Sequence, residues 1–275
     1  MKTTVYTIRA ITNMQPGSGE ATQGVVDNFV QRDPATDNPV IFGSSVKGAI
    51  RSFMEGNQCK GTNEIFGNND KQGSYRFFSA QLIALPLRSN KKPYYLAVSP
   101  GIAKQILEIF DALCFKPDDK LKEELKCLKN LNNLNNPLVE QNINNLVIED
   151  FEQFGELNDC DLSELKKLLH TDNIVILPND KFNEVVNNEN LPVIARNHLE
   201  NGQSKNLWYE QVIPRFSVFM MPLMYPENDT HFSDFDSKLT SNIVQIGGNA
   251  TVGYGYTKFE KIPVGQNNEI QTDNC

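Results

Sequence analysis

The apolar residues of the first segment alternate with polar ones, as they do in a half-buried β-strand. Residues 5–11 (VYTIRAI) follow this period of two. Residues 13–21 (NMQPGSGEA) are rich in turn formers and predict a loop, and residues 24–41, broken by Pro34 and Pro39, are expected to be mostly irregular. An irregular segment of this length favours a functional loop over a simple connector.

The next segment has the spacing of an amphipathic helix. Its apolar stripe, at i, i+3, i+4 and i+7, consists of Val46, Ala49, Ile50 and Phe53. Ser44 or Ser45 can cap the N-terminus of this helix, and Gly56 can end it. Lys47 and Arg51 are four residues apart, so both project from one outer face near the helix start.

Strands and helices continue to interleave after this helix. In chain order, the predicted elements are strands at residues 75–87 and 94–98, a helix at 99–114, a short capped helix at 161–170 and a short strand at 174–177. Ser99 can cap the second helix, and Pro100 suits its first turn.

The last third of the chain predicts a hairpin and a central strand. Residues 193–213 form two mixed segments around Asn201-Gly202, and Asn-Gly is a strong turn signal. Residues 215–225 alternate and then become strongly apolar, as a central strand does. Residues 239–244 and 251–262 flank a glycine-rich loop.

Residues 116–170 differ from the rest of the chain. They are acidic, and residues 129–146 (KNLNNLNNPLVEQNINNL) are dominated by Asn and Leu. Asparagine is a poor helix former, yet Leu and Ile recur every three or four residues, so we expect an inserted lobe that is helical or partly disordered. The chain then divides into a discontinuous core (1–115 and 171–262, with the hairpin 193–213), this lobe, and a flexible tail (263–275).

The order of elements places the chain in the α+β class. Strands and helices interleave without a run of parallel βαβ units, which suits a ferredoxin-like or RRM-like core, common among single-strand RNA binders. The sequence contains no P-loop, Rossmann fingerprint, kinase motif or hydrolase motif.

Charge is distributed unevenly along the chain. The net charge is −8, but residues 1–104 carry 12 Lys/Arg against 7 Asp/Glu, residues 105–200 carry 9 against 19, and residues 201–275 carry 5 against 8. Salt screens charges over about 8–10 Å. The basic N-terminal third can therefore meet a polyanion while the acidic middle faces away, or faces a basic partner subunit.

Metal-binding and targeting signals are weak. The five cysteines have no C-x-x-C pair and an odd count, which argues against a disulfide framework and a cysteine zinc site; most are expected to be free thiols. The three histidines lack ligand spacing. No apolar run has the length of a membrane span and the N-terminus is unlike a signal peptide, so we expect a cytoplasmic protein that is not membrane-bound.

The glycine-rich stretch 246–256 (IGGNATVGYGY) can approach phosphates closely. Glycine lets backbone N–H groups reach a phosphate chain, although a tight β-turn with bulges explains this spacing equally well. Lys47 and Arg51 near a helix N-terminus supply cations and a favourable dipole, and this combination favours phosphate binding.

Several stretches resemble a known family. GSSVKGAIR (43–51) and IGGNATVGYGY (246–256) resemble the signature and the C-terminal glycine-rich loop of the RAMP superfamily of CRISPR proteins. Residues 16–51, with PGSG, GVVD and QRD, are similar to the repeated backbone subunit of the type III-B (Cmr) complex, as are EIFGNND (64–70) and FFSAQLIALPLRS (77–89). The resemblance covers residues 5–100 and 190–260.

The resemblance implies particular RNA contacts. Those expected to bind the backbone of the guide RNA (crRNA) are Ser44, Ser45, Lys47, Arg51, Gly247, Gly248, Gly253 and Gly255. The chain departs from the family pattern at Gln15, where His is usual, and at Ser79, where Asp is usual. Neither departure is expected to abolish RNA binding.

The resemblance singles out Asp27, in GVVD, as the residue needed to cleave target RNA with a divalent metal, Mg²⁺ or Mn²⁺, which Asp27 would help to hold. RNA carries its own nucleophile, the 2′-hydroxyl, so one well-placed carboxylate can deprotonate it or hold the metal against the phosphate. Asp33 and Asp37 are weaker candidates, and Arg32 could offset transition-state charge.

The predicted hairpin resembles the family's thumb, which inserts between guide and target and displaces a base pair at regular intervals. The candidate thumb residues are Arg196, Leu199, Leu207, Trp208 and Tyr209. An ordinary exposed hairpin, or one packed on a neighbouring subunit, is the alternative.

Three functional hypotheses follow. In the first, the chain is a repeated type III-B subunit that coats crRNA as a helical filament, assembles with other Cmr subunits and cuts paired target RNA. In the second, it is only a binding scaffold, with catalysis lost or residing elsewhere in the complex, or it is the type III-A counterpart, although GVVD and QRD favour type III-B. In the third, it trims guide precursors alone, which the lack of a histidine near the glycine-rich loop disfavours.

The double substitution Lys47→Ala with Arg51→Ala is expected to weaken guide RNA binding for all sequences alike and to reduce its salt dependence, because phosphate contacts carry no sequence information. Binding measured over a series of salt concentrations tests this. An unchanged salt slope would remove both residues from the phosphate site.

Overall fold

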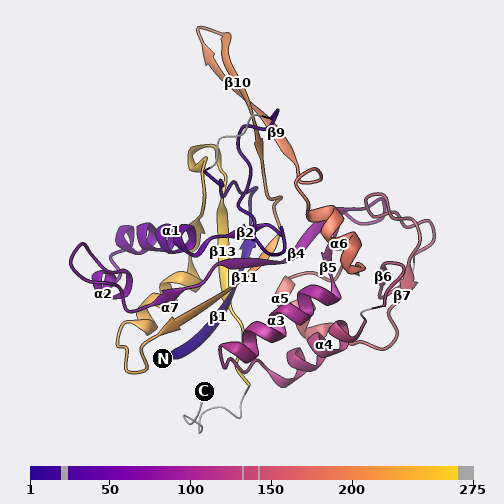
Figure 1. The fold of residues 1–275 in the computed structure, drawn as a ribbon, viewed down its shortest axis with the longest axis horizontal. Helices are drawn as coiled ribbons and strands as arrows, with labels where there is room; N and C mark the ends of the chain where they lie inside the picture. The colour runs from indigo at the N-terminus through magenta and orange to yellow at the C-terminus, as the bar shows by residue number, and fades with distance from the viewer. Residues whose placement is uncertain (20–23, 132, 142, 266–275) are drawn as a thin grey trace.

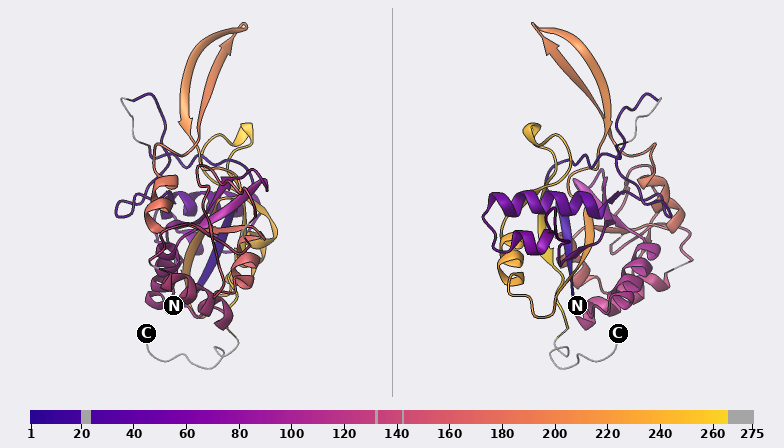
Figure 2. Two further views of the ribbon diagram at one scale, coloured as in Figure 1. Left: turned by 90° about the vertical axis from the view of Figure 1, so that its right-hand side faces the viewer. Right: turned by 60° about the vertical axis from the view of Figure 1, so that its left-hand side comes forward.

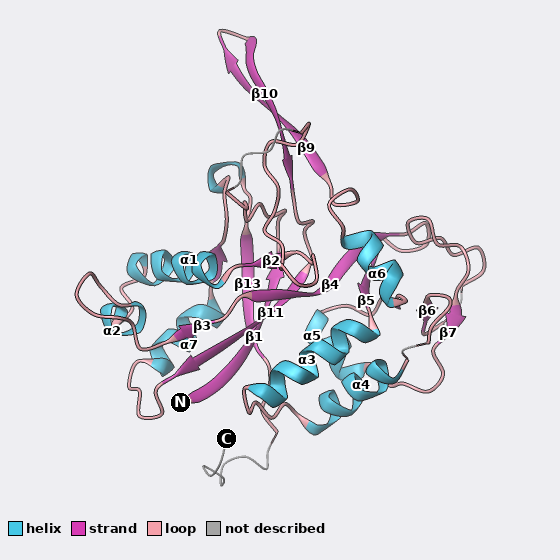
Figure 3. Cartoon of the chain, in the orientation of Figure 1, coloured by secondary structure: helices cyan, strands magenta, loops and turns pink. Residues whose placement is uncertain are grey.

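The computed structural model describes residues 1–19, 24–131, 133–141 and 143–265. Its helices are α1 (Gly43–Gly56), α2 (Thr62–Phe66), α3 (Pro100–Ala112), α4 (Asp119–Asn130), α5 (Ser163–Leu169), α6 (Asn179–Val186) and α7 (Phe232–Ser241), with a 3-10 turn η1 (Ala250–Val252). Its strands are β1 (Lys2–Ala10), β2 (Val40–Ile41), β3 (Arg76–Phe77), β4 (Ala80–Arg88), β5 (Tyr94–Val98), β6 (Leu138–Val139), β7 (Gly155–Glu156), β8 (Ile174–Ile176), β9 (Val193–Glu200), β10 (Gln203–Gln211), β11 (Val218–Tyr225), β12 (Ile243–Gln245) and β13 (Tyr256–Lys261). The predicted α+β class is confirmed (Figure 3).

One mixed sheet organises the chain. Its strand order is β12-β13-β1-β11-β4-β5-β8-β6-β7, with β2 paired to β4 and β3 paired to β11. The first strand, β1, lies antiparallel between β13 and β11, so the first and last strands of the described chain are neighbours near one edge of the sheet. Strands β9 and β10 form a separate two-stranded hairpin that protrudes from the body (Figures 1 and 2).

Helices lie on both sides of the central strands. Successive residues of a strand point to opposite faces. The Tyr6 hydroxyl donates to Asp236 of α7 (2.5 Å), whereas the Thr3 hydroxyl donates to the Leu113 carbonyl just after α3 (2.9 Å). Accordingly α1, α2 and α7 group on one side of β1 in Figure 1, and α3, α4 and α5 group on the other.

Most predicted elements are present, with shifted ends. Helix α3 begins as expected, because the Ser99 hydroxyl accepts a bond from the Ile102 amide (3.3 Å) and Pro100 follows it. The single strand predicted at residues 75–87 is wrong. It is divided into β3 and β4 by Phe78 and Ser79, and both parts pair with β11.

A buried carboxylate links the two helices of the segment 116–170. It contains α4, α5 and the short strands β6 and β7. Glu124 of α4 is buried, and its carboxylate accepts bonds from the Glu164 amide (2.9 Å) and the Leu165 amide (2.8 Å) at the start of α5. The cap of α5 therefore comes from a neighbouring helix, which a local sequence pattern does not reveal.

The prediction that most cysteines are free thiols needs correction. Cys127 in α4 and Cys160 form a disulfide, with their Cα atoms 5.9 Å apart. The two cysteines are 33 residues apart, so no local pattern indicates that they pair. The fold brings them together by packing α4 beside α5. Cys59 is a free, buried thiol, and burial raises its pKa to about 11.

The tail predicted at 263–275 is described only at its start. The Asp118 amide donates to the Pro263 carbonyl (3.1 Å) and the Gly265 amide donates to the Lys116 carbonyl (3.2 Å). Residues 266–275 lie outside the described part of the chain. No helix in the described residues is long and apolar enough to cross a membrane.

Phe235→Ala is expected to lower the free energy of unfolding by about 3–5 kcal/mol. Phe235 of α7 is fully buried, and its ring lies 5.3 Å from that of Tyr75 and 6.3 Å from those of Phe66 and Phe77. Denaturant unfolding measures the change, with Val25→Ala at an exposed position as control. Equal midpoints for the two variants would contradict this packing.

Candidate nucleic-acid interface

The loop that carries Asp27 is fixed to the foot of the hairpin. The Asp27 amide donates to the Tyr209 carbonyl of β10 (2.9 Å), and the Asp27 carboxylate accepts a bond from the Tyr209 amide (2.8 Å). One residue on, the Gln211 amide donates to the Asn28 carbonyl (2.9 Å). Asp27 is exposed, and among the described residues only one of its carboxylate oxygens is engaged. The other oxygen belongs to an exposed side chain and has no hydrogen-bond partner among the described residues.

The buried carboxylate of Glu210 joins three segments at this foot. One of its oxygens receives bonds from the Trp208 indole (2.9 Å) and the Asn28 amide group (3.4 Å). The other receives a bond from Asn249 (2.8 Å) in the glycine-rich loop and pairs with the Arg196 guanidinium (3.2 Å) on β9. The hairpin, the Asp27 loop and the glycine-rich loop therefore share one anchor.

The glycine-rich loop packs against residues 13–17. The Gly248 amide donates to the Gln15 carbonyl (2.9 Å) and the Gly255 amide donates to the Asn13 carbonyl (2.8 Å). Two glycines are required by the fold itself. Gly247 has φ +89° and a Cβ there would lie 2.6 Å from the Gln15 oxygen, and Gly255 has φ +79° with a Cβ 2.0 Å from the Ile246 oxygen. Gly253 also has a positive φ (+83°), which favours glycine, although a Cβ there would meet open space.

The start of α1 is held by residues from outside the helix. The expected caps, Ser44 and Ser45, are wrong, because Phe42 occupies the cap position and makes no side-chain cap bond. The Gly43 amide instead donates to the Ser79 hydroxyl (3.1 Å). The break between β3 and β4 places Ser79 there, so this departure from the family pattern supplies a structural bond.

Gln31 links the two motifs that the sequence singled out. Its side-chain oxygen accepts from the Phe42 amide (2.7 Å), and its side-chain nitrogen donates to the Ser45 hydroxyl (2.9 Å) and to the Gly17 carbonyl (3.1 Å). Gln15, two residues before Gly17, holds the glycine-rich loop. The start of α1 and the glycine-rich loop are thus joined through residues 15–17.

The two cations of α1 differ in their surroundings. Lys47 is half-buried and forms no ion pair with a described residue. Arg51 is paired with Glu55 one turn on (2.7 Å). An exposed pair of this kind contributes only about 0.3–0.5 kcal/mol, so a phosphate can replace Glu55 as the partner of Arg51.

The weaker candidates in residues 32–37 stabilise their own loop. Asp33 accepts bonds from the Ala35 amide and the Thr36 amide (both 3.0 Å), and Arg32 donates to the carbonyls of Asp37 and Val186 (both 2.6 Å). Burial lowers the pKa of Arg32. Arg32 therefore binds backbone carbonyls through Nη1, whereas its Nε and Nη2 are buried without a partner among the described residues.

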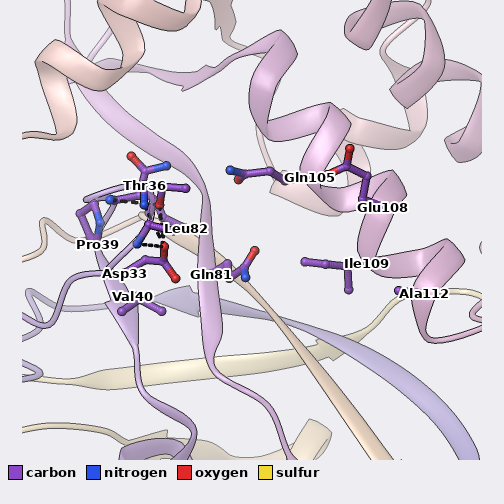
Figure 4. A pocket seen from close by; sticks show the side chains of 12 residues that line it. Asp33, Thr36, Pro39, Val40, Gln81, Leu82, Gln105, Glu108, Ile109 and Ala112 are labelled. Atoms are coloured by element: carbon purple, nitrogen blue, oxygen red, sulfur yellow. Dashed lines mark hydrogen bonds between the residues drawn. The ribbon is translucent and has the colours of Figure 1, made fainter.

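A pocket of about 430 Å³ opens beside this loop but does not include Asp27. Figure 4 shows Asp33 and Thr36 on one side of it and Gln105, Glu108 and Ile109 of α3 on the other. The candidate chemistry is thus at an exposed surface and not in this cavity.

The hairpin side chains divide between two faces. Leu199 and Leu207 are 60% and 54% exposed, and the cross-strand register places them on one face. Arg196 and Trp208 lie on the other, where the Arg196 guanidinium is 5.7 Å from the ring centroids of Trp208 and Tyr254. Tyr209 holds Asp27 through the hydrogen bonds of its backbone amide and carbonyl. Leu199 and Leu207 are therefore more exposed on the hairpin than Trp208.

A divalent metal has few protein ligands here. In the described parts of the chain, no group of three or more His, Cys, Asp and Glu side chains could hold an ion. Mg²⁺ commonly uses one or two carboxylates together with substrate phosphates and water. The outward oxygen of Asp27 fits an ion whose remaining ligands come from RNA and water.

The fold and these motifs agree with comparisons to known proteins. The family model of the RAMP superfamily matches residues 7–259. The chain belongs to the RAMP superfamily. The expected resemblance is therefore confirmed at the level of the family, and the match spans the segment 116–170 that the sequence motifs left uncovered.

Curated relatives of this RAMP protein are similar over nearly their full length. A Pyrococcus furiosus protein named CRISPR system Cmr endoribonuclease Cmr4 is 28% identical, over 94% of this chain and 95% of its own. A Saccharolobus solfataricus protein named CRISPR system CMR subunit Cmr4 is 22% identical, over 92% and 94%.

Solved structures share the fold of this RAMP protein. A chain of the type III-B Cmr-beta complex bound to cognate target RNA superimposes with a TM-score of 0.79 at 20% identity, covering 95% of this chain and 98% of its own. Oligomeric Cmr4 from Pyrococcus furiosus gives 0.72 at 21% identity, covering 95% and 99%.

Sequence reasoning missed Glu210, Asn28, Asn249 and Gln31. One signal was available for Glu210, because residues two apart on a strand share a face and Trp208 carries an indole donor. The partners on other segments become neighbours only in the folded chain, so no local pattern marks them.

Glu210→Gln is expected to destabilise the hairpin foot by about 3 kcal/mol, because it leaves the largely buried Arg196 without its counter-ion and turns an amide toward donors. Hydrogen exchange at the Tyr209 and Gln211 amides reports the local opening. Glu200→Gln, the same change near the exposed tip, is the matched control and should alter exchange little. Equal protection in the two variants would contradict the anchor.

Proposed function

We propose that this chain is the repeated backbone subunit of a type III-B CRISPR ribonucleoprotein, which binds crRNA and cleaves paired target RNA at Asp27. The observation that carries the proposal is the outward Asp27 carboxylate, fixed at the foot of a protruding hairpin by two bonds to Tyr209. Support comes from membership of the RAMP superfamily and from full-length similarity to a protein named Cmr endoribonuclease.

The guide backbone would lie along the start of α1 and the glycine-rich loop. Lys47 lacks an ion pair among the described residues. Arg51 has a weak ion pair with Glu55, which it can give up for a phosphate. Ser44 and Gly253 are exposed and can approach phosphates, whereas Gly247 and Gly255 contribute mainly by shaping the loop. Phosphate contacts of this type give affinity without sequence preference, as a subunit that accepts any guide requires.

The hairpin would act as the thumb of a neighbouring copy's site. Its exposed leucines, Leu199 and Leu207, can wedge between bases, and extruding a base costs a few kcal/mol. The displaced nucleotide would leave a distorted backbone near Asp27 of the adjacent copy. Copies stacked in a helical filament with other Cmr subunits would then cut at regular intervals.

This arrangement gives the core and the lobe separate roles. We assign a ferredoxin-like palm to residues 1–115 and 171–262, with the thumb at 193–213, and a peripheral lobe to 116–170. A subunit that acts on crRNA and target RNA in this way would work in the cytoplasm.

Cleavage would use the 2′-hydroxyl of the target RNA. Its oxygen attacks the adjacent phosphorus, the Asp27 carboxylate accepts the hydroxyl proton, and the bond from phosphorus to the 5′-oxygen breaks. The leaving oxygen takes a proton from water, so the products carry a 2′,3′-cyclic phosphate and a 5′-hydroxyl. A bound Mg²⁺ or Mn²⁺ would neutralise phosphate charge, held by Asp27 if that carboxylate is a ligand and not the base.

Asp27→Asn is expected to reduce cleavage of guide-matched RNA at least a hundredfold while leaving RNA affinity unchanged, within the range that general acid–base catalysis contributes. Asparagine keeps an oxygen that can accept the Tyr209 bond, so the foot of the hairpin stays intact. Gel analysis of the assembled complex measures cut positions and rates, and Asp33→Asn is the matched control.

Regular cuts at the wild-type rate in Asp27→Asn would leave the scaffold hypothesis as the better one. Incubation of the purified chain with guide precursor RNA alone tests the third hypothesis. A stand-alone processor would cut this RNA, whereas a target-cleaving subunit or a scaffold would not.

A further inference from the structure

The sheet face opposite α1 and α7 is only partly covered by helices. The end of α3 meets β1 at Thr3, and the end of α5 meets β13 where His170 contacts Glu260. Beyond these two contacts, toward the glycine-rich loop, Ile243 of β12 and Tyr256 and Lys258 of β13 are exposed, and Arg9 of β1 is half-buried. This uncovered region is unlike the opposite face, which packs against α1 and α7 (Figures 1 and 2).

Strand register gathers specific residues on this region. Lys258 of β13 lies opposite Arg9 of β1 on one side and Ile243 of β12 on the other, and Tyr256 is two residues from Lys258. Residues opposite each other, or two apart, share a face. Tyr256 is 38% exposed and Ile243 is 52% exposed. We call Arg9, Ile243, Tyr256 and Lys258, with Arg215 and Phe216, the open sheet face.

An arginine–aromatic stack forms one side of the open sheet face. The guanidinium groups of Arg9 and Arg215 lie 5.2 Å and 4.1 Å from the centre of the Phe216 ring, which stacks on Tyr94 at 4.9 Å. Phe216 has φ +75°, a strained conformation for a bulky residue, of the kind that tends to persist at functional positions.

The two arginines lack acidic partners. Neither forms an ion pair with any carboxylate of the described residues, and the Arg9 Nε is buried without a hydrogen-bond acceptor among them. Lys258 pairs with Glu260 (2.9 Å), the acid at the edge of the region. In a chain of net charge −8, an uncompensated pair of guanidinium groups is well suited to an external anion.

We propose that the open sheet face binds a single-stranded segment of RNA that continues from the glycine-rich loop. Tyr256 follows Gly255, the last glycine of the loop, so the loop leads directly into the strand that carries this face. A base would stack on the exposed Tyr256 ring, and phosphates would bind Arg9 and Arg215. Sheets with exposed aromatic and basic side chains use this combination to bind single strands. The proposal deepens the proposed function, since it adds a second RNA contact to the same chain.

Binding of the purified full chain to a labelled single-stranded RNA of arbitrary sequence, measured by fluorescence anisotropy over a salt series, tests the proposal. Arg9→Gln with Arg215→Gln should weaken binding about tenfold and reduce the salt slope by about 1.4, the value for two phosphates on a single strand. Lys104→Gln with Lys126→Gln removes the same charge from exposed helical ion pairs and should leave both quantities near wild type.

Stacking is tested separately from charge. Tyr256→Ala should weaken binding about tenfold, whereas Tyr256→Phe should keep wild-type affinity because it preserves the ring. Tyr256 and Arg215 are both exposed, so Tyr256→Ala with Arg215→Gln gives a variant whose folding does not depend on the half-buried Arg9. Thermal unfolding by circular dichroism verifies this.

Wild-type affinity and salt slope in the arginine and Tyr256→Ala variants would overturn the proposal. If those variants instead lose self-association, measured by light scattering, and still bind RNA, the open sheet face belongs to a second copy of the chain. The double variant Lys47→Ala with Arg51→Ala distinguishes a failure of the open sheet face from a failure of the proposed guide-binding site. If that variant alone loses RNA binding, the proposed function survives and only the open sheet face is wrong.

Discussion

The arrangement of the candidate site depends on one buried carboxylate, that of Glu210. Removing a charged group from water is costly unless several donors replace the lost water. Glu210 obtains those donors from β9, β10, the Asp27 loop and the glycine-rich loop. Strands β9 and β10 are not part of the main sheet, and the two loops lie outside its strands. The requirement to satisfy one acid therefore holds the hairpin and two irregular loops together at one point.

The sequence predicted the parts of this fold whose causes are local. The Ser99-Pro100 start of α3 and the Asn201-Gly202 turn follow from residue-level conformational preferences, and the apolar stripe of α1 follows from helical spacing. The α+β class followed from the order of such elements. The RAMP resemblance came from motifs at the start of α1 and in the glycine-rich loop, which the family match supports.

The failures share a different cause. The start of α1 is held by Ser79, α5 is capped by Glu124, and Cys127 meets Cys160 across 33 residues. Each of these contacts joins segments that are distant in sequence, and each changes a boundary or a bond that local patterns had assigned differently. The candidate site shows the same division. Asp27 was found from its motif, but the Tyr209 backbone that fixes it was not.

The two-stranded form of the hairpin has a consequence for assembly. Both β9 and β10 are edge strands, and exposed edges invite pairing with strands of other molecules. The register of the pair is irregular between Ser204 and Asn206, and the residue between them is Lys205. A bulge and a charge are two devices that discourage edge-to-edge addition. In the filament that we propose, these two features would keep the hairpin from polymerising by strand exchange, which would compete with the ordered stack.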